Sequence, residues 1–160
     1  MHKIDYKAIE NLSNEAKKSE RKRINLNIHK QSNDPIQRFL NAMEPGTYIR
    51  PHKHDNPAKR ELFAVVKGKF AIVEFDNLGN ITDYAILSQN SDNYAVEIEP
   101  KSYHTVIALE KSSIALEIKD GPYNPENDKN FASWAPPESD KNNATEFLNK
   151  IIEKLNLKNM

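Results

Sequence analysis

The chain has 160 residues, with 23 basic and 23 acidic side chains and no cysteine. This length suits one domain with a single core, and the charge balance excludes a general electrostatic surface for nucleic acid or an anionic membrane. The lack of cysteine excludes disulfides, thiolate metal sites and a cysteine nucleophile. The amino terminus has no apolar stretch of signal-peptide length, and no apolar run is long enough to span a bilayer, so we expect a cytoplasmic protein.

The first expected element is a short amphipathic helix between Asp5 and Ser19. Apolar residues recur there at helical spacing among charges, and Asp5 is a suitable N-cap. After this N-terminal helical segment, residues 1–22, the apolar period changes from helical spacing to two. Such alternation predicts a strand with one buried face that starts at Arg23.

Short strands then follow one another at close intervals, separated by turns rich in Gly, Pro, Asn and Asp. They are expected at residues 36–43, 46–52, 62–66, 69–75, 81–88, 94–98, 105–110 and 113–119. Because no crossover helices interrupt them, the pattern disfavours a parallel α/β sheet. The pattern predicts a mainly β domain over residues 23–138, built as an antiparallel sandwich or barrel.

The C-terminal part of the chain has two segments of different character. Residues 120–139 are rich in Pro, Asn and charge but also contain Tyr123, Phe131 and Trp134, so we expect an ordered loop that lies on the barrel. Residues 139–160 carry an apolar stripe at helical spacing, which predicts a C-terminal amphipathic helix.

Three histidines and one glutamate suggest a metal site. His52 and His54 are one residue apart, so on an extended strand both imidazoles point to the same face. Glu61 opens the next strand and His104 begins a later one. Such a set suits one divalent ion of Fe, Mn, Co, Ni, Cu or Zn, and affinity order alone does not choose among them. The alternative is a pair of histidines in a polar surface loop and an ordinary buried histidine.

The candidate substrate-binding and catalytic residues lie on the same strands. Strand alternation places Tyr48 and Arg50 on the face of the histidines. Arg50 and Arg38 are candidates to hold a carboxylate or phosphate, or are partners of structural carboxylates. Tyr48 and Tyr123 are candidates to contact a sugar hydroxyl, or pack on the barrel. Glu117 faces either solvent or a polar cavity; in a cavity it is a candidate proton acceptor, with Tyr48 as a second catalytic candidate.

At these positions the chain resembles the cupins, whose first motif reads G-x5-H-x-H-x3-4-E-x6-G. The matching residues are Gly46, His52, His54, Glu61 and Gly68, although six residues rather than three or four separate His54 from Glu61. The second cupin motif, P-x-G-x2-H, is matched less well by residues 100–104, where Ser replaces Gly and one residue is missing.

A closer resemblance is to the WbuC-type cupin-fold metalloproteins, and it spans roughly residues 23–138. The segments that carry it are residues 37–38, 48–54, 121–123 and 131–138. The resemblance implies a cupin double-stranded β-helix, a jelly-roll barrel, with one metal ion on His52, His54, Glu61 and His104. It also implies an association with bacterial surface-polysaccharide (O-antigen) gene clusters, and the cupin resemblance implies a homodimer.

These expectations support more than one function. The first hypothesis is a metal-dependent isomerase or epimerase that acts on a sugar or sugar nucleotide, with Zn, Fe, Mn or Ni as the ion. Oxygen-dependent dioxygenase chemistry is a variant if the ion is iron. The other hypotheses are a non-catalytic sugar-binding or sensing module and a barrel stabilised by structural zinc. In each ligand-binding case the partner is a small polar molecule, not nucleic acid or membrane.

Overall fold

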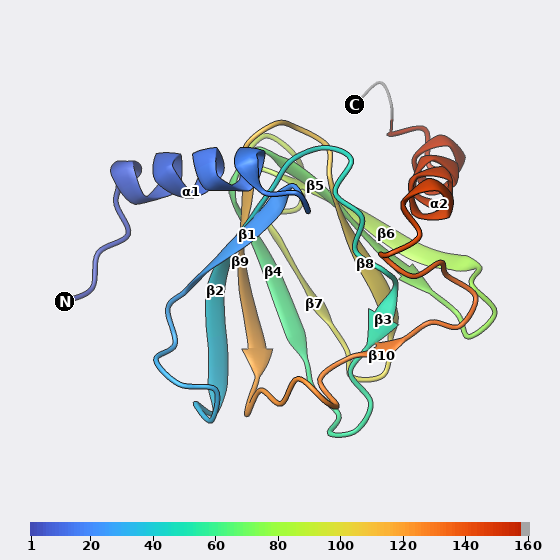
Figure 1. Ribbon diagram of the computed structural model, residues 1–160, viewed down its shortest axis with the longest axis horizontal. Helices are drawn as coiled ribbons and strands as arrows, with labels where there is room; N and C mark the ends of the chain where they lie inside the picture. Colours follow the sequence, from blue (N-terminus) through green and yellow to red (C-terminus); the bar gives the residue numbers. More distant parts are fainter. Residues whose placement is uncertain (158–160) are drawn as a thin grey trace.

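Two antiparallel five-stranded sheets face each other and form the body of the molecule (Figure 1). The structure is a computed structural model that describes residues 1–157. Within these residues the strands are β1 (Arg23–Asn27), β2 (Ile36–Met43), β3 (His52–Lys53), β4 (Glu61–Lys67), β5 (Lys69–Phe75), β6 (Ile81–Ser88), β7 (Ala95–Ile98), β8 (Tyr103–Ala108), β9 (Ser113–Asp120) and β10 (Asn130–Phe131). The helices are α1 (Tyr6–Lys18) and α2 (Lys141–Lys154).

The chain repeatedly crosses from one sheet to the other, which makes the two sheets a jelly-roll barrel. One sheet has the strand order β1-β2-β9-β4-β7 and the other β10-β3-β8-β5-β6. Gly68 is the single residue between β4 and β5, which lie in different sheets. It has a φ of 77°, a conformation that favours glycine. A Cβ at this position would lie 2.3 Å from Ser113 Oγ.

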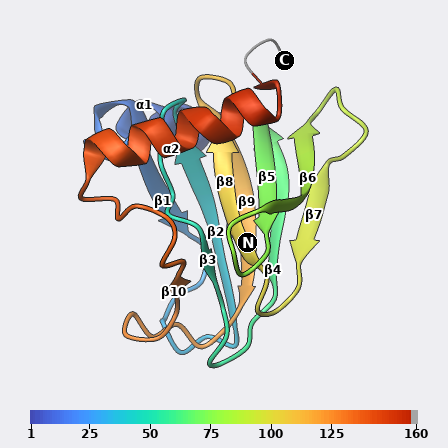
Figure 2. The same ribbon diagram turned by 90° about the vertical axis from the view of Figure 1, so that its right-hand side faces the viewer.

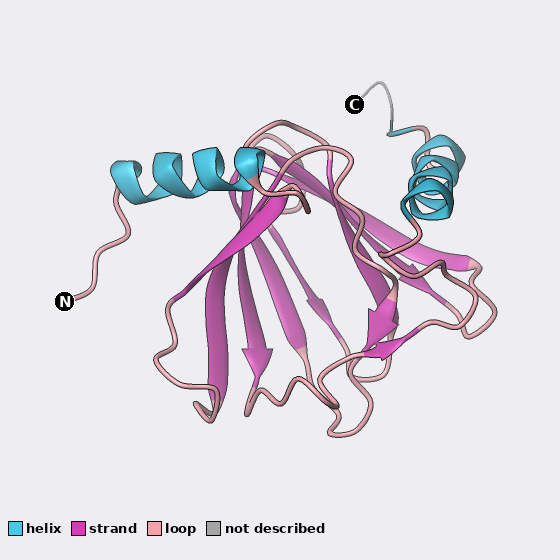
Figure 3. Ribbon diagram, in the orientation of Figure 1, coloured by secondary structure: helices cyan, strands magenta, loops and turns pink. Residues whose placement is uncertain are grey.

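Three apolar clusters hold the layers together, one between the sheets and one under each helix. The helices α1 and α2 lie on opposite outer sides of the barrel (Figures 1 and 3), and each covers one of the two outer clusters. Leu12 and Ala16 of α1 pack on the sheet that contains β2 and β9. Leu148 and Ile151 of α2 pack on β5 and β8, which the helix crosses (Figure 2).

Most expected elements are present. Asp5 caps α1 by accepting a hydrogen bond from the Ala8 amide at 2.9 Å, and β2, β5 and β6 have the bounds that the sequence predicted. The mainly β class with two short helices is confirmed. The division into residues 1–22, 23–138 and 139–160 stays a prediction. Neither helix within residues 1–157 has the length and apolar character that a bilayer crossing needs.

The strand expected at residues 46–52 is replaced by an irregular segment that ends in the two-residue β3. Backbone carbonyls of this segment accept hydrogen bonds from side chains instead of from the backbone of a neighbouring strand. Arg23 donates to the Tyr48 carbonyl at 2.6 Å and Thr105 to the Ile49 carbonyl at 2.6 Å. Pro51 has no amide hydrogen to contribute to a ladder. The sequence prediction of a regular strand here was therefore wrong, and the alternation of β3 does not continue into it, because Ile49 and His52 both line the cavity although they are three residues apart.

Candidate metal centre and its cavity

Three strands bring the four candidate ligands together inside the barrel. His52 on β3 lies opposite His104 on β8 in the strand register, His54 follows β3, and Glu61 begins β4. All four side chains are buried, none more than 3 % exposed. One ligand atom from each residue lies within 4.8 Å of the others, a spacing at which the set could hold one ion.

Backbone carbonyls fix the orientation of all three imidazoles. Each Nδ1 makes a hydrogen bond with a carbonyl oxygen, which only accepts, so Nδ1 carries the hydrogen. The carbonyls belong to Arg50 for His52, Asp128 for His54 and Ser102 for His104. Such contacts leave each Nε2 as the free ligand atom, as metal-binding histidines require.

The contacts of Glu61 require a cation in the cluster. Glu61 Oε2 lies 3.2 Å from His54 Nε2 and 2.9 Å from His104 Nε2. With Nδ1 protonated, these contacts are attractive only if a proton or a metal ion lies between the atoms. Burial holds the pKa of His52 well below its ordinary value. Burial alone would raise the pKa of Glu61, but its contacts with His104 and His54 lower it. A neutral His52 beside an ionised Glu61 fits a divalent ion.

The two departures from the cupin motifs do not displace the ligands. The extra residues after His54 form a tight turn in which Asp55 pairs with Ala58, so Glu61 still reaches the cluster. In the shortened second motif the Lys101 amide donates to the His54 carbonyl at 3.1 Å. This bond holds the turn before β8 against the histidine pair.

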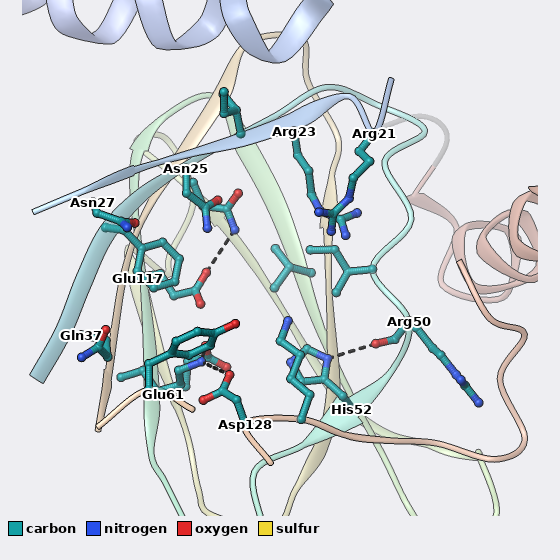
Figure 4. A pocket seen from close by; sticks show the side chains of 18 of the residues that line it. Arg21, Arg23, Asn25, Asn27, Gln37, Arg50, His52, Glu61, Glu117 and Asp128 are labelled. Atoms are coloured by element: carbon teal, nitrogen blue, oxygen red, sulfur yellow. Dashed lines mark hydrogen bonds and ion pairs between the residues drawn. The ribbon is translucent and has the colours of Figure 1, made fainter. Parts of the chain in front are cut away.

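A cavity of about 890 Å³ lies between the sheets, and His52 and Glu61 form part of its wall (Figure 4). Ile49, Phe63 and Val106 separate it from the apolar core between the sheets. Side-chain amides and aromatic rings form another part of the wall, namely Asn25, Asn27, Gln37, Asn41, Phe39, Tyr123 and Phe131. Amides beside aromatic faces suit a polar ligand with hydroxyl groups.

Glu117 faces this cavity rather than solvent. It is buried on β9, and its Oε2 accepts a hydrogen bond from Asn41 Nδ2 at 3.1 Å (Figure 4). Burial raises the pKa of Glu117 well above its ordinary value, and the adjacent Glu61, with which it shares a hydrogen bond, raises it further. A carboxyl group with a raised pKa next to a metal cluster is suited to accept and return a proton.

Of the predicted substrate-binding residues, Tyr123 and Arg50 lie at the cavity. Tyr123 lines the cavity. Arg50 lies at its edge with the guanidinium turned away, because Nη2 donates to the Ala132 carbonyl at 2.7 Å and the group stacks over Phe131 (Figure 4). Arg50 therefore lies beside the cavity without pointing into it.

Tyr48 and Arg38 are not brought to the cluster. The Tyr48 hydroxyl donates to the Pro136 carbonyl at 2.9 Å, and its ring packs against Phe147 of α2. Arg38 is on the exposed face of β2, where it lies 3.6 Å from Asp34. Tyr48 precedes β3 in the irregular segment, so the alternation that placed it beside the histidines does not apply.

Three charged residues near the cluster were not singled out from the sequence. Asp128 and Lys129 belong to the loop before β10, where no periodicity marks which residues turn inward. Lys119 was detectable, because it is two residues from Glu117 on β9 and shares its face. The carboxylate of Asp128 lies 2.7 Å from Lys119 Nζ and 3.0 Å from Lys59 Nζ. The side chains of Asp128, Lys119 and Lys59 are buried.

Solved structures share this fold at low sequence identity. L-ribose isomerase from Cellulomonas parahominis matches with a TM-score of 0.53 and 14 % identity, over 70 % of this chain and 70 % of that chain. KdgF from Halomonas sp. matches with a TM-score of 0.50 and 17 % identity, over 65 % of this chain and 83 % of that chain. These structural neighbours have the cupin fold, so the expected fold is confirmed.

The capsular polysaccharide assembling protein CapF from Staphylococcus aureus matches with a TM-score of 0.50 and 20 % identity, over 68 % of this chain. The match covers only 31 % of CapF. No curated protein matches the sequence. A protein-family model described as "Domain of unknown function (DUF6016)" matches residues 4–87. Since this match spans more than half of the 160 residues, the chain belongs to the DUF6016 family.

Proposed function

We propose that the chain is a metal-dependent enzyme that isomerises or epimerises a sugar or sugar nucleotide. One observation carries the proposal: three imidazole Nε2 atoms and Glu61 converge at the wall of an 890 Å³ cavity, with Glu117 beside them. A purely structural zinc would be closed by its protein ligands and would not need a cavity of ligand size at its side.

His52, His54, Glu61 and His104 would hold one divalent ion, such as Zn, Fe, Mn or Ni. When bound, such an ion would polarise carbonyl or hydroxyl oxygens of the ligand. The carbonyl bonds to each Nδ1 would keep the three imidazoles in place through the reaction.

Glu117 would move the proton. In an isomerisation its carboxylate takes a proton from the hydroxyl-bearing carbon next to a carbonyl and returns it to the former carbonyl carbon, while the hydroxyl proton passes to the former carbonyl oxygen, so no oxidant or second substrate is consumed. In an epimerisation the planar intermediate turns its opposite face to Glu117 before the proton returns to the same carbon. Asn41 orients Glu117 through the 3.1 Å hydrogen bond. The Tyr48 hydroxyl is occupied by the Pro136 carbonyl, so we assign proton transfer to Glu117.

We propose a sugar as the ligand because of the side chains that line the cavity and because of the proteins whose structures are similar. Amide side chains and aromatic rings line the cavity, and Tyr123 among them is proposed to contact the ligand. Two fold neighbours carry sugar-related names, L-ribose isomerase and the capsular polysaccharide assembling protein CapF. Together with the resemblance to WbuC-type proteins, they support a place in surface-polysaccharide (O-antigen) biosynthesis. Substrate contacts by Arg50 and Arg38, a homodimer and a cytoplasmic location stay predictions from the sequence.

Proton exchange in heavy water tests the proposal without knowledge of the product. The metal-loaded protein is incubated in D₂O with a panel of aldoses, ketoses and sugar nucleotides, and deuterium at the carbon next to the carbonyl is followed by NMR. We expect exchange with at least one sugar. Glu117→Gln should slow it by about 100-fold or more, whereas Tyr48→Phe should change it by less than about threefold.

Other outcomes would assign the site differently. Ligand binding without exchange would favour a sugar-binding or sensing module. Oxygen consumption by the iron-loaded protein would favour a dioxygenase. Bound zinc with no ligand binding at all would favour a structural site. Each of these results would contradict the proposed isomerase or epimerase.

A further inference from the structure

Charged side chains of both signs line the cavity, although the whole chain is neutral. Arg21, Arg23, Lys119 and Lys129 stand against Glu61, Glu117, Asp128 and Glu138, and Arg50 lies at the edge with its guanidinium turned away. A divalent ion on the candidate ligands would make the balance in the cavity positive. A cavity with excess positive charge and low-dielectric walls attracts anions.

Most of these cations already have partners. Among residues 1–157, the paired ones are Arg23 with Glu138 at 2.8 Å, Lys119 with Asp128 at 2.7 Å, Arg50 with the Ala132 carbonyl at 2.7 Å and Arg21 with Glu138 at 3.5 Å. Lys129 makes no hydrogen bond or ion pair with any residue in the same described range. It is therefore the cavity cation that is free to bind a ligand.

The strand register places Lys129 beside the metal cluster. β10 pairs antiparallel with β3, and Phe131 lies opposite His52, with ring centroids 6.1 Å apart. Continued toward the N-terminus, the same register puts Lys129 opposite His54. Lys129 and Phe131 are two residues apart and both line the cavity, so the loop presents the ammonium group on the face that carries the histidines.

The electrostatic surroundings agree with this position. Lys129 is exposed and lines the cavity, so a ligand in the cavity can reach it. Burial lowers its pKa, whereas the charges of Glu61 and Glu117 raise it, as expected for an ammonium group near both carboxylates. An anion paired with an ammonium group in such a setting is held more strongly than at the surface.

We propose that the cavity takes a sugar that carries a carboxylate or phosphate group, and that Lys129 is the residue that binds this anionic group. The inference rests on the proposed function in one respect, which is that the bound sugar is the substrate. Lys129 differs from Arg50 and Arg38, the anchors expected from the sequence, because its charged group points into the cavity and is unpaired.

Three probes that share one sugar ring test the charge requirement and its source. The metal-loaded protein is titrated by calorimetry with D-galactose, D-galacturonate and D-galactose 1-phosphate. We expect at least one acidic probe to bind about 10-fold to 100-fold more tightly than galactose, the range for a charge-assisted contact. The stronger of the two acids identifies the anionic group as carboxylate or phosphate. Equal affinity for all three, or no acid binding at about 10 mM, would overturn the proposal.

Substitutions test whether Lys129 causes the preference for the acidic probe. Lys129→Met should reduce the preference for the acidic probe to near that of galactose, and Lys129→Arg should retain most of it. Lys7→Met removes the same charge from an exposed position on α1 and should leave the preference unchanged. If Lys129→Met weakens the acid and galactose equally, or if Lys7→Met has the same effect as Lys129→Met, the proposal fails.

Titration of metal-free protein separates this proposal from the proposed function. Anion preference that depends on Lys129 and persists without metal would support the anion site even if no sugar exchanges deuterium. If preference for the acid exists only with metal and survives in Lys129→Met, the anion binds elsewhere in the cavity. A melting curve and the metal content of each variant verify that it is folded and loaded.

Discussion

Asp128 joins the metal cluster to the loop that closes the cavity. Its carbonyl accepts the hydrogen bond from His54 Nδ1, and its carboxylate lies between Lys59 and Lys119. Burial alone would raise the pKa of Asp128, but Lys119 and Lys59 lower it below its ordinary value of 3.8. Asp128 therefore orients the candidate ligand His54 through its backbone and anchors its own loop through its side chain.

Replacement of Asp128 by Asn should destabilise the protein by about 3 kcal/mol, because two buried ammonium groups lose their carboxylate. Chemical denaturation measures this difference. The matched control is Asp120→Asn, whose carboxylate forms a 3.4 Å ion pair with Arg60 at the surface and should cost less than about 1 kcal/mol. Equal costs for the two variants would contradict this role of Asp128.

The pH dependence of the same variant has a defined sign. A carboxyl whose pKa is lowered on folding contributes stability above its unfolded pKa, and that contribution is lost as the pH falls through the folded pKa. The difference in unfolding free energy between wild type and Asp128→Asn should therefore shrink below pH 3.8. A difference that stays constant or grows on acidification would contradict the assigned cause.

At the residue level the sequence predicted the buried cluster better than the rest of the site. His52, His54, Glu61 and His104 were expected together because motif spacing survives loop changes such as the extra residues before Glu61, and the structure brings them together. The positions of residues outside regular strands were harder to predict. Alternation failed for Tyr48, and nothing in the sequence of the loop before β10 distinguishes Lys129, which lines the cavity, from the other residues of that loop.

At the level of elements, Gly68 forms the corner where the chain leaves one sheet for the other. Gly68→Ala should destabilise the protein by about 2 kcal/mol or more, because a left-handed conformation and the close approach to Ser113 both oppose a Cβ. Gly46→Ala is the control. Gly46 has a similar φ of 84°, but a Cβ there would meet only Lys22 Nζ at 3.4 Å. Urea denaturation should show the larger loss for Gly68→Ala, and a larger loss for Gly46→Ala would contradict the close-approach argument.

Strands of six or more residues were predictable because alternation over that length is a strong signal, as β2, β5 and β6 show. The two-residue strands β3 and β10 were not predictable in this way. β3 pairs with both β10 and β8, and the sequence alone does not reveal such contacts between distant segments. Yet these two strands position His52 and the loop that carries Lys129.

The whole molecule is a barrel with helices on opposite sides and two kinds of interior. An apolar cluster fills one part of the space between the sheets, and the polar cavity occupies another. The buried carboxylates, lysines and imidazoles around the cavity are costly to bury unless they are paired or hold an ion. This organisation is understandable if the barrel stabilises a metal centre and leaves room for a ligand beside it.

The metal content of the purified protein, measured by mass spectrometry on material from its native host, tests the metal centre most directly. We predict close to one divalent ion per chain. His104→Ala should abolish it, whereas His29→Ala should retain it, because His29 lines the same cavity but is hydrogen-bonded to Arg38 and lies outside the cluster. Wild-type protein without metal, or equal metal content in the two variants, would contradict a metal centre built from His52, His54, Glu61 and His104.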